Sequence, residues 1–334
     1  MKKVSVIVAV YGVEYWIEES LRSLLSQSLP PEQLEIIIVN DASPDDSMEI
    51  ARRLVETQFP ERRPYVKFID HPFNMGVSHT RRDGILAATG DYIIHFDPDD
   101  LLHPQAYELM LAEAERAGAD VTLCDFLFVG SAKHTHLPQR PLEMTARCLM
   151  EQICGARVPS RHGSMCNKLI VSSLYERVKL PERINFCEDA MTVCMMLCLP
   201  GVTVASTDLP LYTYRFREGS MVGTSNYEGD IRLYKELGKR AAEASETWQR
   251  DSFSAFISSL LYHRSYLEFR GTAKEFARRF GRFEIYVDFA ANVPKGEKRR
   301  LHQALEGKRL NSKFSRRLRY LVNNRIARLK ARFC

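Results

Sequence analysis

Four consecutive residues, Asp97-Pro98-Asp99-Asp100, place three carboxylates beside one another directly after an apolar run. Such neighbours repel one another unless a cation or strong hydrogen-bond donors lie among them. Asp97 and Asp99 are two positions apart, so in an extended segment they point the same way, and Pro98 restricts the backbone between them. Oxygen ligands on one face suit Mg²⁺ or Mn²⁺, which needs only one or two carboxylates besides substrate phosphates. Alternatively, Asp100 caps a following helix and the other two acids are solvated.

A second acidic pair, Glu188-Asp189, precedes an almost wholly apolar segment that we interpret as a buried helix starting near Ala190. A carboxylate at this position can act as a general base for a hydroxyl within hydrogen-bond reach. Alternatively, the two acids cap the helix and interact with its dipole. These residues alone do not choose between Glu188 and Asp189 as the base.

The elements that must position these acids are visible as continuously apolar runs separated by amphipathic segments. Continuous rather than alternating apolar runs indicate strands buried on both faces, hence a mostly parallel sheet. The runs are Val4–Tyr11, Glu35–Asn40, Val66–Asp70, Asp91–Phe96 and Val121–Phe128. Helix stripes lie between them, at Ile17, Leu21, Leu24 and Leu25, at Ile50, Leu54 and Val55, and at Tyr107, Leu109, Met110 and Leu111.

This alternation predicts a doubly wound α/β domain with helices on both faces of the sheet. Ligands of such sheets lie beyond the carboxyl ends of the strands. Asp41, Asp70 and Asp97 lie at the ends of three of the first four predicted strands, so we expect them along one edge. From Tyr227 onward the pattern is helical, with breaks near Gly271 and Pro294.

Composition sets wider limits. Charged residues make up 27% of the 334 residues and hydrophobic residues 45%, so the chain is not disordered as a whole. No apolar run reaches about 18 residues, so no transmembrane helix is expected. The eight cysteines include no Cys-x-x-Cys pair, and most lie in apolar company as reduced core thiols. A cytoplasmic compartment fits this pattern best.

Four segments in a fixed order resemble the family 2 glycosyltransferases, which have the GT-A fold. They are residues 4–11, 36–43, 74–84 and 90–100, and with Glu188-Asp189 the likeness extends over residues 4–222. The resemblance implies a nucleotide-sugar donor, usually a UDP-sugar, and a divalent cation, Mn²⁺ or Mg²⁺. It also implies inversion at the anomeric carbon during transfer.

The resemblance further implies roles for single residues. Asp41 would accept the uracil N3–H, which agrees with the chemistry, since cytosine has an acceptor there that a carboxylate would repel. The alternative for Asp41 is an Asx-turn with Ser43. Asp99 would be the principal metal ligand with Asp97 supporting it, and Arg81 would be a cation near the nucleotide and the acidic loop.

On the acceptor side, the resemblance makes Asp189 the base and Glu188 a residue that positions the acceptor. Lys168 matches a lysine whose role stays open. Residues 212–221 match a closing segment whose arginine and serine reach the diphosphate as a lid, with an ordinary surface loop as the alternative. Ala9 stands where the family usually has proline. The candidate nucleotide-sugar contacts are Ala9, Tyr11, Glu14, Asp41, Arg81, Asp97, Pro98, Arg217 and Ser220.

We therefore expect a GT-A domain at residues 1–224, with a nucleotide-sugar half at 1–130 and an acceptor half at 131–224. A helical extension at 225–294 and a basic tail at 295–334 follow. The expected reaction is one in-line displacement, in which Asp189 takes the proton of an acceptor hydroxyl as it attacks C1 of the sugar. A glycan or lipid-linked acceptor of cell-surface polysaccharide synthesis is expected.

Three other functions remain as alternatives. A nucleotidyltransferase of similar fold would carry a Gly-rich basic loop after the first strand, where this chain has Tyr11-Gly12-Val13-Glu14. A nucleic-acid binder using the tail would carry a known reading module, and we find none, so no nucleic acid is expected. An inactive scaffold is disfavoured because Asp99 and Asp189 are retained.

The tail itself is strongly basic. Residues 295–334 hold fourteen Lys and Arg against two Glu, a net charge of +12, which leaves −7 for residues 1–294. An apolar stripe in this tail is flanked by Arg and Lys, and no acid lies between Lys308 and Cys334. This pattern predicts a helix in an anionic membrane interface over residues 308–334, on the inner face of the membrane. Packing on the acidic catalytic domain and a partner-binding role are the alternatives. The stripe is Phe314, Leu318, Leu321, Val322, Ile326, Leu329 and Phe333.

Overall fold

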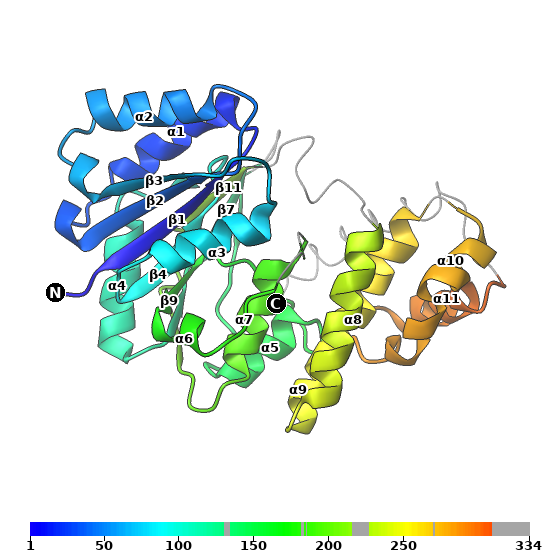
Figure 1. Cartoon of the computed structure of the whole chain (residues 1–334). Coiled ribbons are helices and arrows are strands. Elements are labelled where there is room, and N and C mark those ends of the chain that lie inside the picture. The colour runs from blue at the N-terminus through cyan, green and yellow to red at the C-terminus, as the bar shows by residue number, and fades with distance from the viewer. Residues whose placement is uncertain (130–133, 182–183, 185, 216–226, 270, 309–334) are drawn as a thin grey trace. The chain divides into compact units, whose positions relative to one another are not determined.

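The computed structural model describes residues 1–308 except 130–133, 182–183, 185, 216–226 and 270 (Figure 1). The chain divides into two compact units, one made of Met1–Leu149 and Arg161–Ser220, the other of Met150–Ser160 and Met221–Cys334. The predicted lid residues Arg217 and Ser220 and the apolar stripe of the tail lie outside the described residues.

A seven-stranded sheet forms the centre of the first unit, with strand order β10-β6-β9-β4-β1-β2-β3. All neighbours are parallel except β9, which runs antiparallel to β4 and β6. The carboxyl ends of β1 to β4 therefore lie at one edge. The bounds are β1 (Val4–Val10), β2 (Leu34–Asn40), β3 (Val66–Asp70), β4 (Tyr92–Phe96), β6 (Val121–Leu123), β9 (Lys168–Val171) and β10 (Val204–Ser206).

Helices cover both faces of this sheet, as predicted for a doubly wound fold (Figure 1). The stripes of α1, α2 and α4 pack on the face that holds Val4, Val6 and Val8. Helix α3 lies on the opposite face, against Ile7. The bounds are α1 (Glu14–Leu25), α2 (Ser47–Thr57), α3 (Val77–Ala87), α4 (Ala106–Ala117), α5 (Ala146–Ile153), α6 (Ser173–Glu176) and α7 (Glu188–Leu197), with 3₁₀ turns η1 (Pro31–Gln33) and η2 (Arg63–Tyr65).

A second, four-stranded sheet corrects one prediction, because the apolar run Val121–Phe128 is two strands and not one. Strand β6 ends at Leu123 in the first sheet, and β7 starts at Phe126 in the second. The chain turns at Asp125, whose buried carboxylate accepts hydrogen bonds from His136 and from the backbone of Gln139. The second sheet has the order β5-β11-β7-β8, with β5 (Leu101–Leu102), β7 (Phe126–Val129), β8 (His134–Leu137) and β11 (Tyr212–Arg215).

The second unit is helical around a core rich in aromatic rings, such as Tyr234 against Phe283 at 5.3 Å. Helix α10 begins after a capping box at Thr272, and α11 begins after Pro294, so the predicted breaks are confirmed. Leu301 and Leu305 of α11 are buried in this unit. The bounds are α8 (Tyr227–Glu243), α9 (Thr247–Leu260), a π-helical segment (Leu261–Tyr266), α10 (Ala273–Phe280), a 3₁₀ segment (Gly281–Tyr286) and α11 (Lys295–Leu305).

Two compositional predictions can be compared with the described residues. None of the helices described here is both long and apolar enough to cross a lipid bilayer. No disulfide forms among the seven cysteines in the described part of the chain, and five of these are buried.

Glu35 anchors the opposite edge of the sheet, far along β2 from the predicted site. Its buried carboxylate accepts hydrogen bonds from Ser5 Oγ at 2.5 Å and from the Thr89 backbone at 2.8 Å, and it pairs with Lys67 at 2.8 Å. Burial raises the pKa of Glu35, but these hydrogen bonds outweigh it and hold the pKa at about 2.

Replacing Glu35→Gln should lower the free energy of unfolding at pH 7 by about 3 kcal/mol, since one pKa unit corresponds to about 1.4 kcal/mol. The folded pKa lies below the unfolded value, so this stabilisation is present above pH 4.5 and is lost as the pH falls towards 2. Urea unfolding between pH 7 and pH 3 would measure it. A difference between wild type and variant that does not shrink on acidification would contradict the assignment.

Candidate active site

Arg81 on α3 lies where two acidic segments meet. Its guanidinium donates to Glu188 in the first turn of α7 and, at 2.9 Å, to Asp97 Oδ1 after β4. The side chain is only 12% exposed. Burial lowers the pKa of Arg81, but Glu188, Asp97 and Asp189 outweigh it and raise that pKa, so the guanidinium stays charged. The two predicted acidic segments are thus joined through one buried cation.

Two glycines determine where α3 carries Arg81. Gly76 precedes the helix with φ 86°, a conformation that favours glycine. Gly84 lies against β1, where a Cβ atom would stand 2.4 Å from Ile7 Cγ2. Any larger residue at Gly84 would push α3 away from the sheet, and Arg81, one turn earlier on the helix, would move with it.

Asp100 is a structural anchor and not a helix cap. It is 1% exposed, its Oδ2 accepts from the Tyr212 hydroxyl at 2.8 Å, and its Oδ1 accepts from the Arg215 backbone N–H at 2.8 Å. The Tyr212 oxygen in turn accepts from the Asp97 N–H at 3.2 Å. The predicted alternative that Asp100 caps a helix is therefore wrong, because α4 starts well after Asp100, following Gln105. Strand β11 holds the acidic loop instead.

The acidic loop concentrates negative charge at the edge of the sheet. Burial raises the pKa of Asp97; Arg81 opposes this, whereas Asp99 and Asp189 add to it. Burial, with the neighbouring carboxylates of Asp97 and Asp99, raises the pKa of Asp100 to about 8. Within the described ranges, no group of three or more His, Cys, Asp or Glu is arranged to hold a metal ion. The carboxylates of Asp97 and Asp99 fit a hard cation that takes one or two protein ligands and completes its shell with phosphate and water.

Arg215 also fixes this loop, and it was not among the predicted site residues. Its Nε donates to the Asp99 carbonyl at 2.5 Å, and another guanidinium nitrogen donates to Ser20 Oγ at 2.8 Å. The guanidinium lies over the Trp16 ring, 4.8 Å from its centre. Arg215 therefore ties α1 and β11 to the backbone of Asp99, a predicted metal ligand.

Asp41, after β2, holds the loop that leads into α3. Its carboxylate accepts from the N–H groups of Met75 at 2.7 Å and Gly76 at 2.9 Å, and it lies 3.0 Å from His71 Nδ1. Ser43 N–H donates to Asn40 at 2.8 Å, so the Asx interaction predicted as the alternative for Asp41 belongs to Asn40. A carboxylate offers about four lone-pair sites, so one remains at Asp41.

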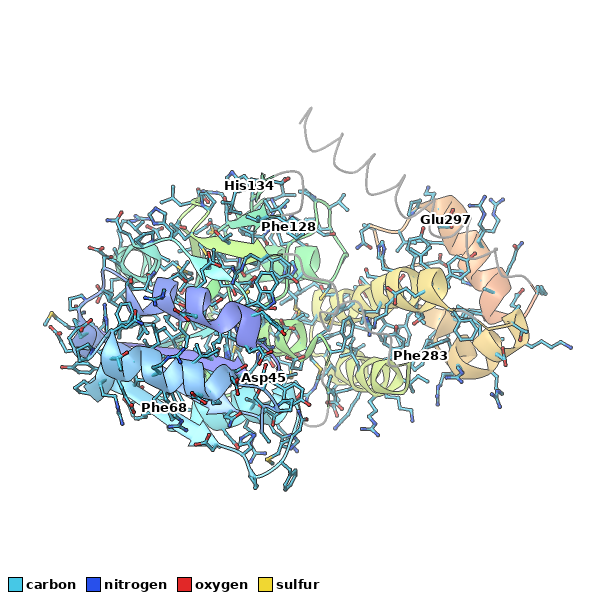
Figure 2. The ribbon with its side chains drawn as sticks, turned by 90° about the horizontal axis from the view of Figure 1, so that it is seen from above. Asp45, Phe68, Phe128, His134, Phe283 and Glu297 are labelled. Carbon is cyan, nitrogen blue, oxygen red and sulfur yellow. The ribbon has the colours of Figure 1, made fainter. Side chains whose placement is uncertain are left out.

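Hydrogen bonds connect the turn after β1 with the turn after β2. Gly12 N–H donates to Ser43 Oγ at 2.8 Å, and Glu14 N–H donates to Asp45 at 3.0 Å (Asp45 is labelled in Figure 2). Tyr11 at the tip is 50% exposed. Of the other predicted contacts on this edge, Ala9 is half-buried at the end of β1, and Pro98 is buried in the acidic loop.

Glu188 and Asp189 occupy the first turn of α7 but differ in surroundings. Glu188 is 5% exposed and pairs with Arg81. Burial raises the pKa of Glu188, Arg81 opposes this, and Asp189 adds to it. Asp189 is half-buried, and its Oδ1 accepts from the Ala190 N–H at 2.7 Å. The predicted helix thus begins at Glu188, slightly before the expected start near Ala190.

Comparison with known proteins identifies the family to which this site belongs. A family model described as glycosyl transferase family 2 matches residues 5–169. A Bacillus subtilis protein named as the uncharacterized glycosyltransferase EpsJ is 34% identical over 256 residues, which cover 72% of each chain. This chain belongs to glycosyl transferase family 2.

Among the other similar proteins, the solved structures agree with the GT-A type of fold. The minor teichoic acid biosynthesis protein GgaB of Bacillus subtilis is 23% identical over 77% of this chain but only 26% of its own length. S. aureus TarS 1-349 in complex with UDP-GlcNAc has a TM-score of 0.69 at 20% identity, over 92% of this chain and 88% of that one. Mannosyltransferase PcManGT from Pyrobaculum calidifontis, in complex with GDP-Man and Mn²⁺, has a TM-score of 0.53 at 16% identity, over 92% and 87%.

In this glycosyltransferase the buried Lys168 organises the loop before β9. Its ammonium donates to the carbonyls of His162 and Ser164 and to Asn167 Oδ1, each at 2.8 Å, so all three N–H bonds are used. Burial lowers the pKa of Lys168 to about 8 while Asp189 opposes it, so the group stays mostly charged at neutral pH. The structural partners of Lys168 are thus backbone and amide oxygens, which the sequence did not indicate.

Proposed function

We propose that this family 2 glycosyltransferase moves a sugar from a UDP-sugar to a hydroxyl of a glycan or lipid-linked acceptor, with inversion. The observation that carries the proposal is the ion pairing of Arg81 with both Asp97 and Glu188, which brings the donor-side and acceptor-side acids around one cation. The teichoic acid role in the name of GgaB and the UDP-GlcNAc complex of TarS support this donor and acceptor class.

On the donor side, the proposed nucleotide contacts are Asp41, Tyr11 and Glu14, with Ala9 and Pro98 beside them. The lone-pair site remaining at Asp41 supports a hydrogen bond from uracil N3–H, which cytosine does not offer. The sequence-based lid residues Arg217 and Ser220 complete this part of the proposal.

For the leaving group, we propose that Asp99 and Asp97 hold Mn²⁺ or Mg²⁺ together with the donor diphosphate. A bound cation would neutralise the charge that develops on the departing diphosphate. The Mn²⁺ in the PcManGT complex agrees with this assignment. Arg81 holds Asp97 in place from the other side, at 2.9 Å.

For the attack, we propose Asp189 as the base that takes the proton of the acceptor hydroxyl. The pairing of Glu188 with Arg81 supports this choice, because it commits the Glu188 carboxylate to a buried ion pair. Glu188 then positions the helix start that carries Asp189, and through it the acceptor.

Two substitutions should separate chemistry from binding. Asp189→Asn keeps the side chain's shape but accepts no proton, so transfer should fall about 10²-fold or more while UDP affinity is retained. Asp41→Asn should weaken UDP binding and reduce the preference for UDP over CDP. Calorimetric titration with UDP and CDP, and transfer rates with a panel of UDP-sugars, would measure both effects.

Equal loss of UDP binding in Asp189→Asn would show that Asp189 is structural. A parallel loss of UDP and CDP affinity in Asp41→Asn would show that Asp41 acts only through the Met75–Gly76 loop, whose N–H groups it binds.

Metal removal tests the acidic loop. EDTA should abolish transfer and Mn²⁺ or Mg²⁺ should restore it, because the diphosphate leaves with its charge neutralised by the cation. Asp99→Asn should lose both turnover and Mn²⁺ binding, the latter followed by electron paramagnetic resonance, while thermal unfolding stays unchanged. Full activity in the presence of chelator would exclude the metal site.

We propose further that the basic residues within 308–334 bind an anionic membrane surface, where the enzyme would meet a lipid-linked acceptor on the cytoplasmic side. Each basic residue near such a surface contributes about 1 kcal/mol. Truncation before α11 would remove Leu301 and Leu305, which are buried, and would uncover the core on which they pack, so charge substitutions are the cleaner test.

Replacing Arg316→Gln, Arg317→Gln and Arg319→Gln together should weaken co-sedimentation with anionic vesicles about 100-fold at low salt, from about 3 kcal/mol of lost attraction. Lys274→Gln, Arg278→Gln and Arg279→Gln in α10 make a matched control of equal charge. Equal vesicle binding by wild type and the tail variant would refute the membrane role.

A further inference from the structure

His162 is exposed yet held at three separate atoms. Its backbone N–H donates to Gln139 Oε1 at 2.8 Å, and its carbonyl accepts from Lys168 Nζ at 2.8 Å. Its ring Nδ1 lies 2.9 Å from Ser164 Oγ. The ring also packs edge-on against Phe126, with the ring centres 5.2 Å apart. Holding an exposed histidine by this many contacts does little for the core, which indicates a role for its side chain at the surface.

The hydrogen bonds around Nδ1 of His162 determine whether the other ring nitrogen, Nε2, carries a proton. The Ser164 N–H points at Nδ1 from 3.4 Å, and Cys166 Sγ donates to Ser164 Oγ at 3.4 Å, which leaves the serine proton for Nδ1. Nδ1 is thus the acceptor and the neutral ring carries its proton on Nε2. In the described part of the chain, Nε2 has no protein hydrogen-bond partner, so an N–H donor points outward.

This donor lies in the electrostatic field of the proposed base. Loss of water around the packed side of the ring and the nearby Lys168 ammonium lower the pKa of His162, whereas Asp189 raises it. The charge of Asp189 also raises the pKa of Lys168, against the effect of burial. His162, Lys168 and Asp189 therefore form one neighbourhood, although α6 and the segments around it separate β9 from α7 in the chain.

Phe126 also contacts Tyr214, which in turn contacts Phe128. Tyr214 packs edge-on against Phe126 at 6.4 Å, and it stacks on Phe128 with ring centres 5.5 Å apart and planes at 13°. Tyr214 and Phe128 are half-buried, whereas Phe126 below them is buried. Burial raises the pKa of Tyr214, and the carboxylates of Asp100, Asp97 and Asp99 add to this, so its hydroxyl is close to the acidic loop.

We propose that His162, Tyr214 and Phe128, built on Phe126, form the subsite that binds a sugar ring of the acceptor. The inference rests on the proposed function, because it takes Asp189 as the base. A sugar presents hydroxyls and one apolar face, which suit an outward N–H donor beside flat aromatic rings. The acidic loop is next to Tyr214, because the following residue, Arg215, donates its backbone N–H to Asp100 at 2.8 Å, and Asp189 influences the pKa of His162. Lys168 acts through His162 as a positioning residue.

The test is saturation-transfer NMR on the full-length protein, with methyl β-glycosides of glucose, galactose and N-acetylglucosamine as probes in the presence of UDP. His162→Phe keeps the ring contact with Phe126 but removes the donor, so glycoside affinity should fall about 3- to 10-fold. His162→Gln, which retains an N–H donor, should restore most of it. Tyr214→Ala should also weaken glycoside binding, and Lys168→Met should reproduce the effect of His162→Phe through the released loop.

His134→Phe is the matched control. His134 lies on β8 opposite Val129, so the strand register puts it on the other face of the sheet from Phe128. His134 and Phe128 are both labelled in Figure 2. Replacement of His134 should leave glycoside binding unchanged. UDP affinity should stay within about twofold in every variant, because none of these side chains belongs to the proposed nucleotide contacts. Because the readout is binding, absence of UDP binding or transfer in the wild type would refute the proposed function while the glycoside data still decide this inference.

Four results would overturn the subsite. They are no glycoside binding by the wild type, unchanged glycoside affinity in both His162→Phe and Tyr214→Ala, equal loss in His134→Phe, and loss of UDP affinity in parallel with glycoside affinity. The last result would assign these residues to the donor.

Discussion

One buried guanidinium between two carboxylates holds the edge of the sheet together. Arg81, Asp97 and Glu188 come from α3, from the loop after β4 and from α7, so a single ion-paired group fixes three elements. Removing the positive charge would leave the buried Glu188 carboxylate and the half-buried Asp97 carboxylate without compensation, a cost of several kcal/mol. Lysine would not replace it, because an ammonium lacks the planar fork that reaches both acids at once. The close contact of Gly84 with Ile7 serves this arrangement, since it sets the depth of α3.

The central sheet could be predicted because the residues of each strand carry the signal for that strand. All four residues of the run Ile36–Val39 are apolar and buried, so the run itself indicates a strand that is covered on both faces. The prediction of one strand over Val121–Phe128 was wrong, because a continuous apolar run does not indicate where the chain leaves one sheet and enters another. One signal was present: Asp125 interrupts the run, and a buried acid there requires donors that only a turn supplies.

The candidate site was predictable only in part. Strand ends carry Asp41 and Asp97, and the start of a helix carries Asp189, so topology alone points to them. The hydrogen bond of Arg215 to the Asp99 carbonyl joins residues that are 116 positions apart in the chain. The position of His162 depends on hydrogen bonds with Gln139 and Lys168, which come from other segments. No periodicity or spacing in the chain encodes such partners, because they arise when the second sheet folds over the acidic loop.

The two acidic pairs share one design. In each pair one acid is buried against protein donors: Asp100 binds Tyr212 and the backbone of Arg215, and Glu188 binds Arg81. Its neighbour, Asp99 or Asp189, is half-buried at the same edge. An anchored acid fixes the backbone to which the adjacent acid is attached, and so helps to position the adjacent carboxylate. The residues alone gave no reason to prefer Asp189 over Glu188 as the base, and the buried ion pair of Glu188 supplies one.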